Sequence, residues 1–70
     1  MSTNPAIHQL AASLAESATL NMTGVTARAV ADLMEVEFQE LFYKYPEMYR
    51  LVGGYAQHII DARSGRTVQS

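Results

Sequence analysis

The sequence predicts an all-α fold, a small four-helix bundle that contains a helix-turn-helix. Apolar residues recur at three- and four-residue spacing in four segments, the pattern of amphipathic helices. Residues 24–51 indicate two short helices joined by a tight turn and followed by a helix that a proline starts, which is the layout of a helix-turn-helix. No segment is predicted to form a strand.

The chain length limits the organisation to one domain. Its 70 residues divide into a helical domain over residues 1–63 and a polar tail over residues 64–70. A domain of this size buries only roughly 60% of the surface that its unfolded chain exposes. We therefore expect a homodimer. The start at Met1 and the polar end at Ser70 favour a complete protein.

Composition excludes several classes of protein. There is no cysteine, hence no disulfide framework, and no apolar run approaches the about 20 residues of a membrane helix. Residues 1–15 lack the basic start and apolar stretch of a signal peptide, so a cytoplasmic protein is expected. Five basic residues face seven acidic ones, and five of the acids lie within residues 24–51. Non-specific nucleic-acid binding, which depends on phosphate neutralisation, would be weak.

The first predicted helix runs from Pro5 to about Ala18. Asn4 is a suitable N-cap, and proline is favoured at the first helical position. One face carries the apolar residues Ile7, Leu10, Ala11, Leu14, Ala15 and Ala18. A connector over residues 19–24 follows, and Met22 and Val25 are expected to reach the core.

Two short helices are predicted next, with Thr26 as the N-cap of the first. Its inner stripe is Ala27, Val30, Ala31 and Met34, supported by Leu33. Residues 35–37 are expected to make the turn. The inner stripe of the following helix is Phe38, Leu41, Phe42 and Tyr45, and its outer face is Gln39, Glu40, Tyr43 and Lys44.

The last predicted helix starts at Pro46 and reaches about Ala62. Its apolar stripe is Met48, Leu51, Val52, Tyr55, Ala56 and Ile59. Gly53 and Gly54 lie inside it, where each glycine costs roughly 1 kcal/mol relative to alanine. A kink or a close helix contact is expected there. Arg63 and Arg66 either contact phosphates or complement the dipole of this helix.

Residues 7–60 resemble the N-terminal DNA-binding domain of TetR-type repressors, most clearly over residues 24–51. The matching residues, in order, are Gly24-Val25-Thr26, Val30-Ala31, Val36, Leu41-Phe42-Tyr43-Lys44-Tyr45, Pro46 and Leu51. The resemblance implies that Thr26 and Arg28 touch phosphates. It also implies that Glu37, Phe38 and Gln39 approach base edges, and that Tyr43 and Lys44 contact the DNA backbone. Gln39 is the best base reader, since glutamine can bond bidentately to adenine.

Three departures from the family pattern bear on DNA binding. Glu35 replaces the usual turn glycine, so the resemblance implies a positive φ at Glu35. Glu37 replaces a small capping residue, and Met48 replaces a lysine that clamps a phosphate. The 70 residues do not contain the ligand-binding domain that usually follows in that family, and we expect none. The resemblance thus favours a DNA-binding transcriptional regulator, a homodimer joined mainly through the last helix.

The alternative is a protein-binding module that keeps the helix-turn-helix fold. An anti-activator or anti-repressor of a phage or mobile element would grip a host transcription factor through an acidic aromatic face, with the interface residues Tyr43, Met48, Tyr49 and Tyr55. Phe42 and Tyr45 are expected to pack inside, and Tyr43 and Tyr49 to be exposed. We expect no enzyme, cofactor or small-molecule ligand, because no nucleophile or glycine-rich loop accompanies the acids. His8 and His58 lack ligand spacing and are expected to be solvated or capping histidines rather than metal ligands.

Overall fold

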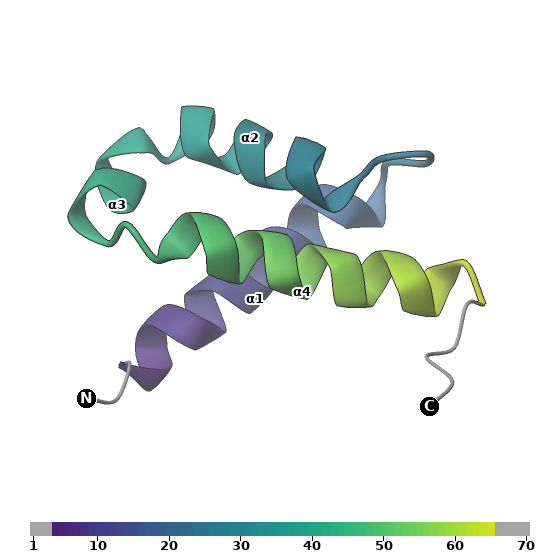
Figure 1. The fold of residues 1–70 in the computed structure, drawn as a ribbon, viewed down its shortest axis with the longest axis horizontal. Coiled ribbons are helices and arrows are strands. Elements are labelled where there is room, and N and C mark those ends of the chain that lie inside the picture. Colours follow the sequence, from purple (N-terminus) through teal and green to yellow (C-terminus); the bar gives the residue numbers. More distant parts are fainter. Residues whose placement is uncertain (1–3, 66–70) are drawn as a thin grey trace.

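The computed structural model describes residues 4–65 and shows four helices (Figure 1). Their bounds are Pro5–Leu20 for α1, Ala27–Glu37 for α2, Gln39–Lys44 for α3 and Met48–Arg63 for α4. Within these residues there is no strand, so the all-α prediction is confirmed. None of the helices in this range combines the length and apolarity that crossing a lipid bilayer requires.

Side-chain caps start the first two helices as predicted. The Asn4 carboxamide oxygen accepts a hydrogen bond from the Ala6 amide at 2.9 Å, and Pro5 occupies the first position of α1. The Thr26 hydroxyl accepts from the Ala29 amide at 3.1 Å. Each cap satisfies an amide that has no partner inside its helix, which fixes where the helix begins.

The first helix continues beyond its predicted end. Residue Thr19, which we had placed in the connector, is fully buried, and α1 ends at Leu20. The Thr19 hydroxyl donates to the Ala15 carbonyl at 2.8 Å. Because this bond satisfies the hydroxyl within the helix, threonine can occupy the buried last turn at little cost.

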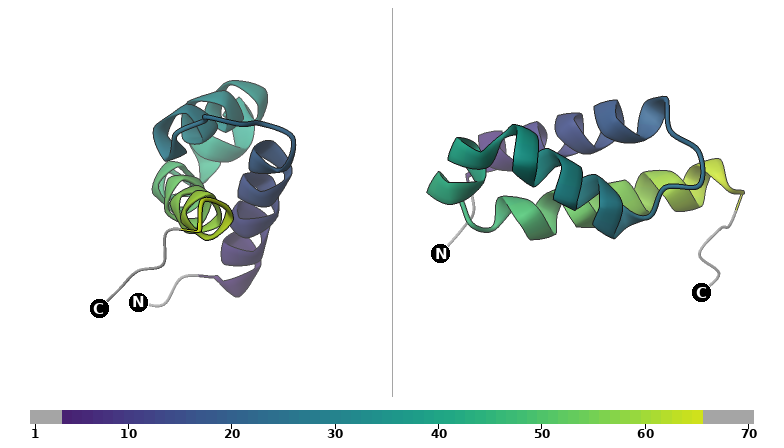
Figure 2. Two further views of the ribbon diagram at one scale, coloured as in Figure 1. Left: turned by 90° about the vertical axis from the view of Figure 1, so that its right-hand side faces the viewer. Right: turned by 90° about the horizontal axis from the view of Figure 1, so that it is seen from above.

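In the left view of Figure 2, which looks nearly along α4, α2 lies above this helix and α1 lies to one side of it. Both α1 and α2 pack against α4, and α3 lies beyond the N-terminal end of α4 (Figure 1). The core is drawn from all four helices, and its buried members are Ile7, Ala11, Leu14, Ala15, Ala18, Val30, Ala31, Met34, Phe42, Met48, Val52 and Ala56. The predicted inner stripes therefore hold in outline.

Four residues expected inside lie at the surface. Leu10, Leu33, Met22 and Phe38 are exposed, whereas Val25 packs against the core as predicted. Leu33 projects beside the buried stripe of α2 rather than on it, so α1 and α4 leave it uncovered. Met22 belongs to the loop between α1 and α2, which passes over the surface.

The turn between α2 and α3 differs from the prediction. Helix α2 continues through Glu35 and Glu37, and Phe38 alone joins it to α3. The Phe38 amide still bonds to the Met34 carbonyl at 2.8 Å. No residue other than glycine has a positive φ within residues 4–65, so the expected strain at Glu35 is absent from this part of the chain. Without a glycine to end it, the helix runs on to Phe38.

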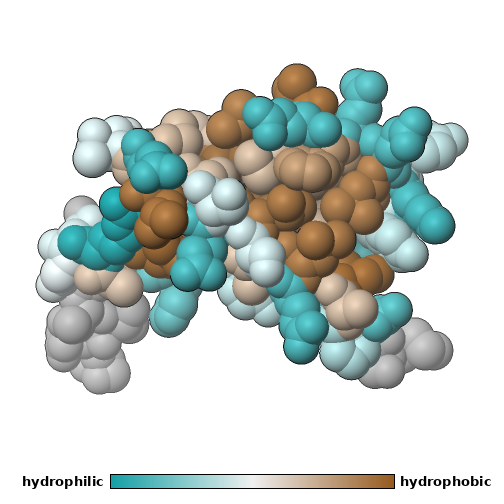
Figure 3. Space-filling view, turned by 180° about the vertical axis from the view of Figure 1, so that it is seen from behind, coloured by the Kyte–Doolittle hydropathy of each residue, from teal (hydrophilic) through white to brown (hydrophobic). Residues whose placement is uncertain are grey.

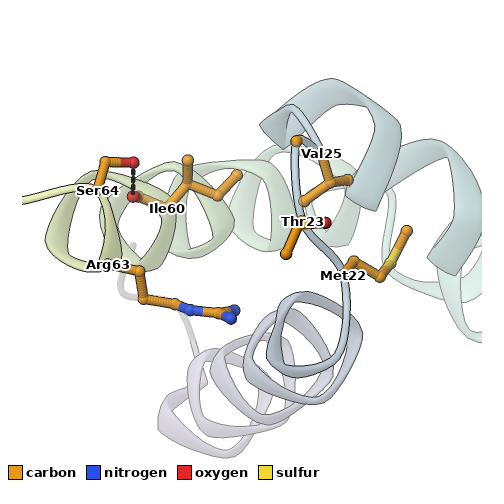
Figure 4. A pocket seen from close by; sticks show the side chains of 7 residues that line it. Met22, Thr23, Val25, Ile60, Arg63 and Ser64 are labelled. Carbon is orange, nitrogen blue, oxygen red and sulfur yellow. Dashed lines mark hydrogen bonds between the residues drawn. The ribbon is translucent and has the colours of Figure 1, made fainter.

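The C-terminal end of α4 is held to the end of α1. The Arg63 guanidinium reaches across to the carbonyls of Thr19 and Leu20, and the Arg63 Nη2 to Leu20 O distance is 3.1 Å. Figure 4 shows this side chain beside a hollow of about 210 Å³ that Met22, Thr23 and Val25 also line. Arg63 thus satisfies unpaired carbonyls at the end of α1. It also stands in the last turn of α4, where a positive charge complements the helix dipole as expected.

The boundary of the predicted tail also shifts. Ser64 and Gly65 cap α4: the Ser64 amide bonds to the Ile60 carbonyl at 3.0 Å, and Gly65 has φ +72°. A residue in this left-handed conformation ends many helices, and glycine takes it without steric cost. Arg66 and the rest of the predicted tail lie outside the described residues.

The two helical glycines do not kink α4, which runs as one helix from Met48 to Arg63. A β-carbon on Gly53 would lie 3.8 Å from the Ala31 β-carbon, which is an ordinary contact, and one on Gly54 would meet nothing within 4 Å. Gly53 thus lies where α4 packs closely against α2, so the expected helix contact is found at Gly53 and the expected kink is not. No contact in the described fold uses Gly54.

We predict that Gly54→Ala raises the free energy of unfolding by about 1 kcal/mol, because alanine favours the helix and finds open space. The control is Gly24→Ala. Because Gly24 has φ +69°, which disfavours alanine, this change should lower the free energy of unfolding by about 1 kcal/mol or more. Urea denaturation followed by circular dichroism measures both. A destabilised Gly54→Ala monomer would show that this helix face is not open.

Candidate functional site

The outer face of α3 is the most prominent surface that the fold leaves uncovered. Of the α3 side chains only Phe42 is buried, and Leu41 is half-buried. The remaining four, all exposed, are Gln39, Glu40, Tyr43 and Lys44. Tyr43 is 89% exposed, the largest value among the exposed large hydrophobic residues of the described chain. The predicted outer face is confirmed, and nothing in the described fold occupies it.

Carboxylates surround this face. Glu35, Glu37 and Glu40 are all exposed at or near the junction of α2 and α3. The cation on α3 is Lys44, whose ammonium lies 5.6 Å from the centre of the Tyr45 ring. That distance allows a cation–π interaction, which holds the charge near the ring. The face therefore combines one positive group with several negative ones.

A second cationic region lies between α2 and α4. Arg28 from α2 and Arg50 from α4 line the same hollow of about 380 Å³, together with Tyr49 and Gln57. Arg28 was expected to touch phosphate, but nothing in the sequence analysis assigned a role to Arg50. The sequence feature that could have indicated Arg50 is its position in the first turn of α4, at the outer edge of the apolar stripe. Thr26 is exposed at the start of α2, and its hydroxyl is the helix cap.

Tyr49 is not the free aromatic anchor that the sequence suggested. It is half-buried, and its hydroxyl donates to the Asp32 carboxylate at 2.7 Å. This hydrogen bond raises the pKa of the Tyr49 phenol above its ordinary value, and partial desolvation adds to the shift. Because the folded-state pKa is the higher one, the bond stabilises the fold at neutral pH and is lost as the pH rises through that pKa.

Met48 and Tyr55 also fail to form an exposed surface with Tyr43. Met48 is 0% exposed and lies at the centre of the core, so its expected exposure is wrong. Tyr55 is half-buried, and its hydroxyl lies 3.1 Å from the Nδ1 atom of His8 on α1. Thus the four predicted interface residues are not brought together, and only Tyr43 is fully available. His8 contacts Tyr55, whereas His58 is exposed.

A patch of apolar side chains does gather near α3. Val36 is 73% exposed, and Leu33, Phe38 and Tyr43 are also exposed. Figure 3 shows apolar side chains covering much of the half of the rear face nearer to α3. Val36 and Tyr43 line a hollow of about 610 Å³ together with Glu35 and Glu40. Sequence analysis placed Val36 in a turn and gave it no role, so this patch was missed.

Comparison of the chain with protein-family models, with curated proteins and with solved structures found no match. The likeness to TetR-type repressors thus rests on the motif residues of 24–51. Within residues 4–65 there is also no group of three histidine, cysteine or carboxylate side chains that would hold a metal ion.

We predict that Met48→Lys, which introduces the lysine that TetR-type repressors carry at the matching position, destabilises the protein by about 3 kcal/mol or more. The reason is that position 48 is completely buried, so the charge would lose its hydration. The control Met48→Leu conserves volume and should cost less than about 1.5 kcal/mol. Thermal unfolding measures both. A stable Met48→Lys protein with tighter DNA binding would show instead that position 48 faces the DNA.

Proposed function

We propose that the chain is a small DNA-binding transcriptional regulator in which α2 and α3 form a helix-turn-helix. The observation that carries the proposal is the placement of α3. It follows α2 after the single residue Phe38 and is viewed nearly end-on when α2 lies across the view (Figure 1). A steep crossing of two short helices is typical of this motif. The whole outer face of the second helix remains exposed.

The side chains of that face have the chemistry of a DNA reader. Gln39 stands at the first position of α3, where base contacts are made in helix-turn-helix proteins, and its carboxamide matches the edge of adenine. Tyr43 and Lys44 lie at the other end of α3 and would contact phosphates. Thr26 and Arg28, at the start of α2, would contact the backbone across the groove. Glu37 and Phe38 would flank the bases.

The electrostatics of the surface limit how this binding would work. Arg28 and Lys44 are the cations on α2 and α3, and Glu35, Glu37 and Glu40 oppose them. Each phosphate contact contributes about 0.9 to the salt slope, so one copy would bind weakly and with a shallow slope. A homodimer would double the contacts and set two recognition helices about 34 Å apart, one turn of the duplex.

We predict that Lys44→Ala weakens binding to all duplexes alike, because phosphate contacts carry no sequence information. Gln39→Ala should instead remove about 1–3 kcal/mol of discrimination at one base pair. Gln9→Ala, an exposed glutamine on α1, is the matched control and should change nothing. Fluorescence anisotropy against a set of single-base duplex variants measures all three. A base-selective loss with Lys44→Ala would contradict its assigned role.

One observation favours a second candidate function, a protein-binding module. Val36 and Tyr43 are unusually exposed for their size, and carboxylates surround them. Such a surface suits the basic DNA-binding face of a host transcription factor, as an anti-activator or anti-repressor of a phage or mobile element would need. The apolar pair would supply contact area and the acids would supply specificity.

The second function predicts that Val36→Ser and Tyr43→Ala each reduce the affinity for the partner protein at least tenfold, by removing central apolar contacts. Leu20→Ser, on the exposed side of α1, is the matched control and should leave the complex intact. Quantitative affinity capture from host lysate with the three variants measures this. An equal yield of the same stoichiometric partner from all three would reject this surface as the binding site.

A further inference from the structure

The outer face of α4 carries a self-complementary stripe. Arg50, Gly54, Gln57 and Asp61 follow one another at four- and three-residue spacing, so they lie along one side of the helix. The first three are exposed and Asp61 is partly exposed. A positive charge thus stands near the N-terminal end of the stripe and a negative charge near its C-terminal end. The Gln57 amide donates to one Asp61 oxygen at 2.9 Å and orients that carboxylate.

The surface at the middle of this stripe, at Gly54, is a shallow depression. Gly54 has open space where a β-carbon would stand. On one flank, Gly54 and Tyr55 line a hollow of about 410 Å³, and on the other, Gly53 and Gln57 line one of about 380 Å³. An exposed glycine in a helix interior costs stability, and no contact in the described fold repays it. A second helix packed across this depression could come close to the backbone of α4.

We infer that the partner of this face is the α4 of a second copy, packed antiparallel about a two-fold axis between Gly54 and Gln57. In that arrangement Arg50 faces Asp61 of the second copy, and Asp61 faces Arg50 of the second copy. Gly54 faces Gln57 in the same way. An isologous contact of this kind requires a self-complementary surface, which the opposite charges at the two ends provide. A parallel pairing would instead set like charges against each other.

The geometry of the α4–α4 dimer agrees with the DNA-binding function proposed above. The biological role of the dimer rests on that proposed function. Two-fold pairing about this point separates the two Met48 residues by about 22 Å along the axis, at 1.5 Å per residue. Since α3 lies beyond that end of α4, the two α3 helices stand farther apart still (Figure 1). That spacing approaches the about 34 Å between successive major-groove half-sites.

The interface is small and polar, so the dimer is weak. One helix pair buries less than the about 1,200 Å² that marks the lower limit of stable complexes. The ion pairs lie at the surface, where salt screens them. The dimer should therefore form at high protein concentration and low ionic strength, and dissociate as salt is added. Binding to adjacent DNA half-sites would raise its effective concentration.

The test is sedimentation equilibrium of the full chain, from micromolar to millimolar protein at low and physiological salt. Arg50→Asp and Asp61→Arg should each weaken the dimer about tenfold, since each replaces two attractive contacts by two repulsive ones. The double variant Arg50→Asp with Asp61→Arg restores the pairing and should restore the dimer. Glu16→Arg, on exposed α1, matches the change in net charge of Asp61→Arg and should have no effect.

Gly54→Ala supplies an independent readout, because it should stabilise the monomer while its methyl group separates the paired helices and weakens the dimer. A wild-type chain that stays monomeric at millimolar concentration and low salt would overturn the inference. So would a dimer that the two charge reversals leave unchanged. Loss of DNA binding with the dimer intact would count against the proposed function alone, and DNA binding by a strict monomer would count against the dimer alone.

Discussion

The buried stripe of α4, formed by Met48, Val52 and Ala56, is the surface on which the other helices are assembled. All three side chains are completely buried, and α1 and α2 both pack against this helix. Ala11 on α1 and Ala31 on α2 are also buried, and their small side chains allow the close packing that such a small core needs. Arg63 then joins the end of the same helix to the end of α1. The orientation of α2, and through it of α3, depends on this stripe.

The same stripe also limits the chemistry of the surface that we propose to contact DNA. Because Met48 is part of the core, the start of α4 cannot provide the phosphate contact that the family pattern implies. The remaining cations near α3 are few, and Glu35, Glu37 and Glu40 oppose them. A single copy would therefore bind DNA only weakly through non-specific phosphate contacts. Base contacts from Gln39 and a second copy joined through α4 would have to supply the rest.

Local signals predicted the helices well. Asn4 and Thr26 marked two helix starts because a side-chain oxygen before an apolar periodic segment can satisfy a free amide. The stripe that contains Met48 and Val52 predicted burial from spacing alone, and that spacing was better evidence about Met48 than its alignment with a surface lysine. The turn was misplaced because the family pattern was applied to Glu35, which lacks the glycine that gives that turn its shape.

The features of the candidate site that depend on distant residues were not predictable. Arg63 bonds to carbonyls more than forty positions away, and Tyr49 bonds to Asp32 on another helix. Neither pairing leaves a mark in local periodicity. Likewise, the open space over Gly54 and the exposure of Val36 follow from which helix covers which face, and that is decided by packing. Residue types therefore indicated the outer face of α3, while the three-dimensional arrangement revealed the stripe on α4.

The central claim is that the outer face of α3 contacts DNA, and amide chemical-shift mapping tests it most directly. The labelled full chain would be titrated with a random-sequence duplex pool at low ionic strength, where even a few phosphate contacts support binding. The account predicts shifts concentrated at Gln39, Tyr43 and Lys44, with smaller shifts at Thr26 and Arg28. No shifts, or shifts confined to residues remote from α3 such as Ser13 and Ser17, would contradict it.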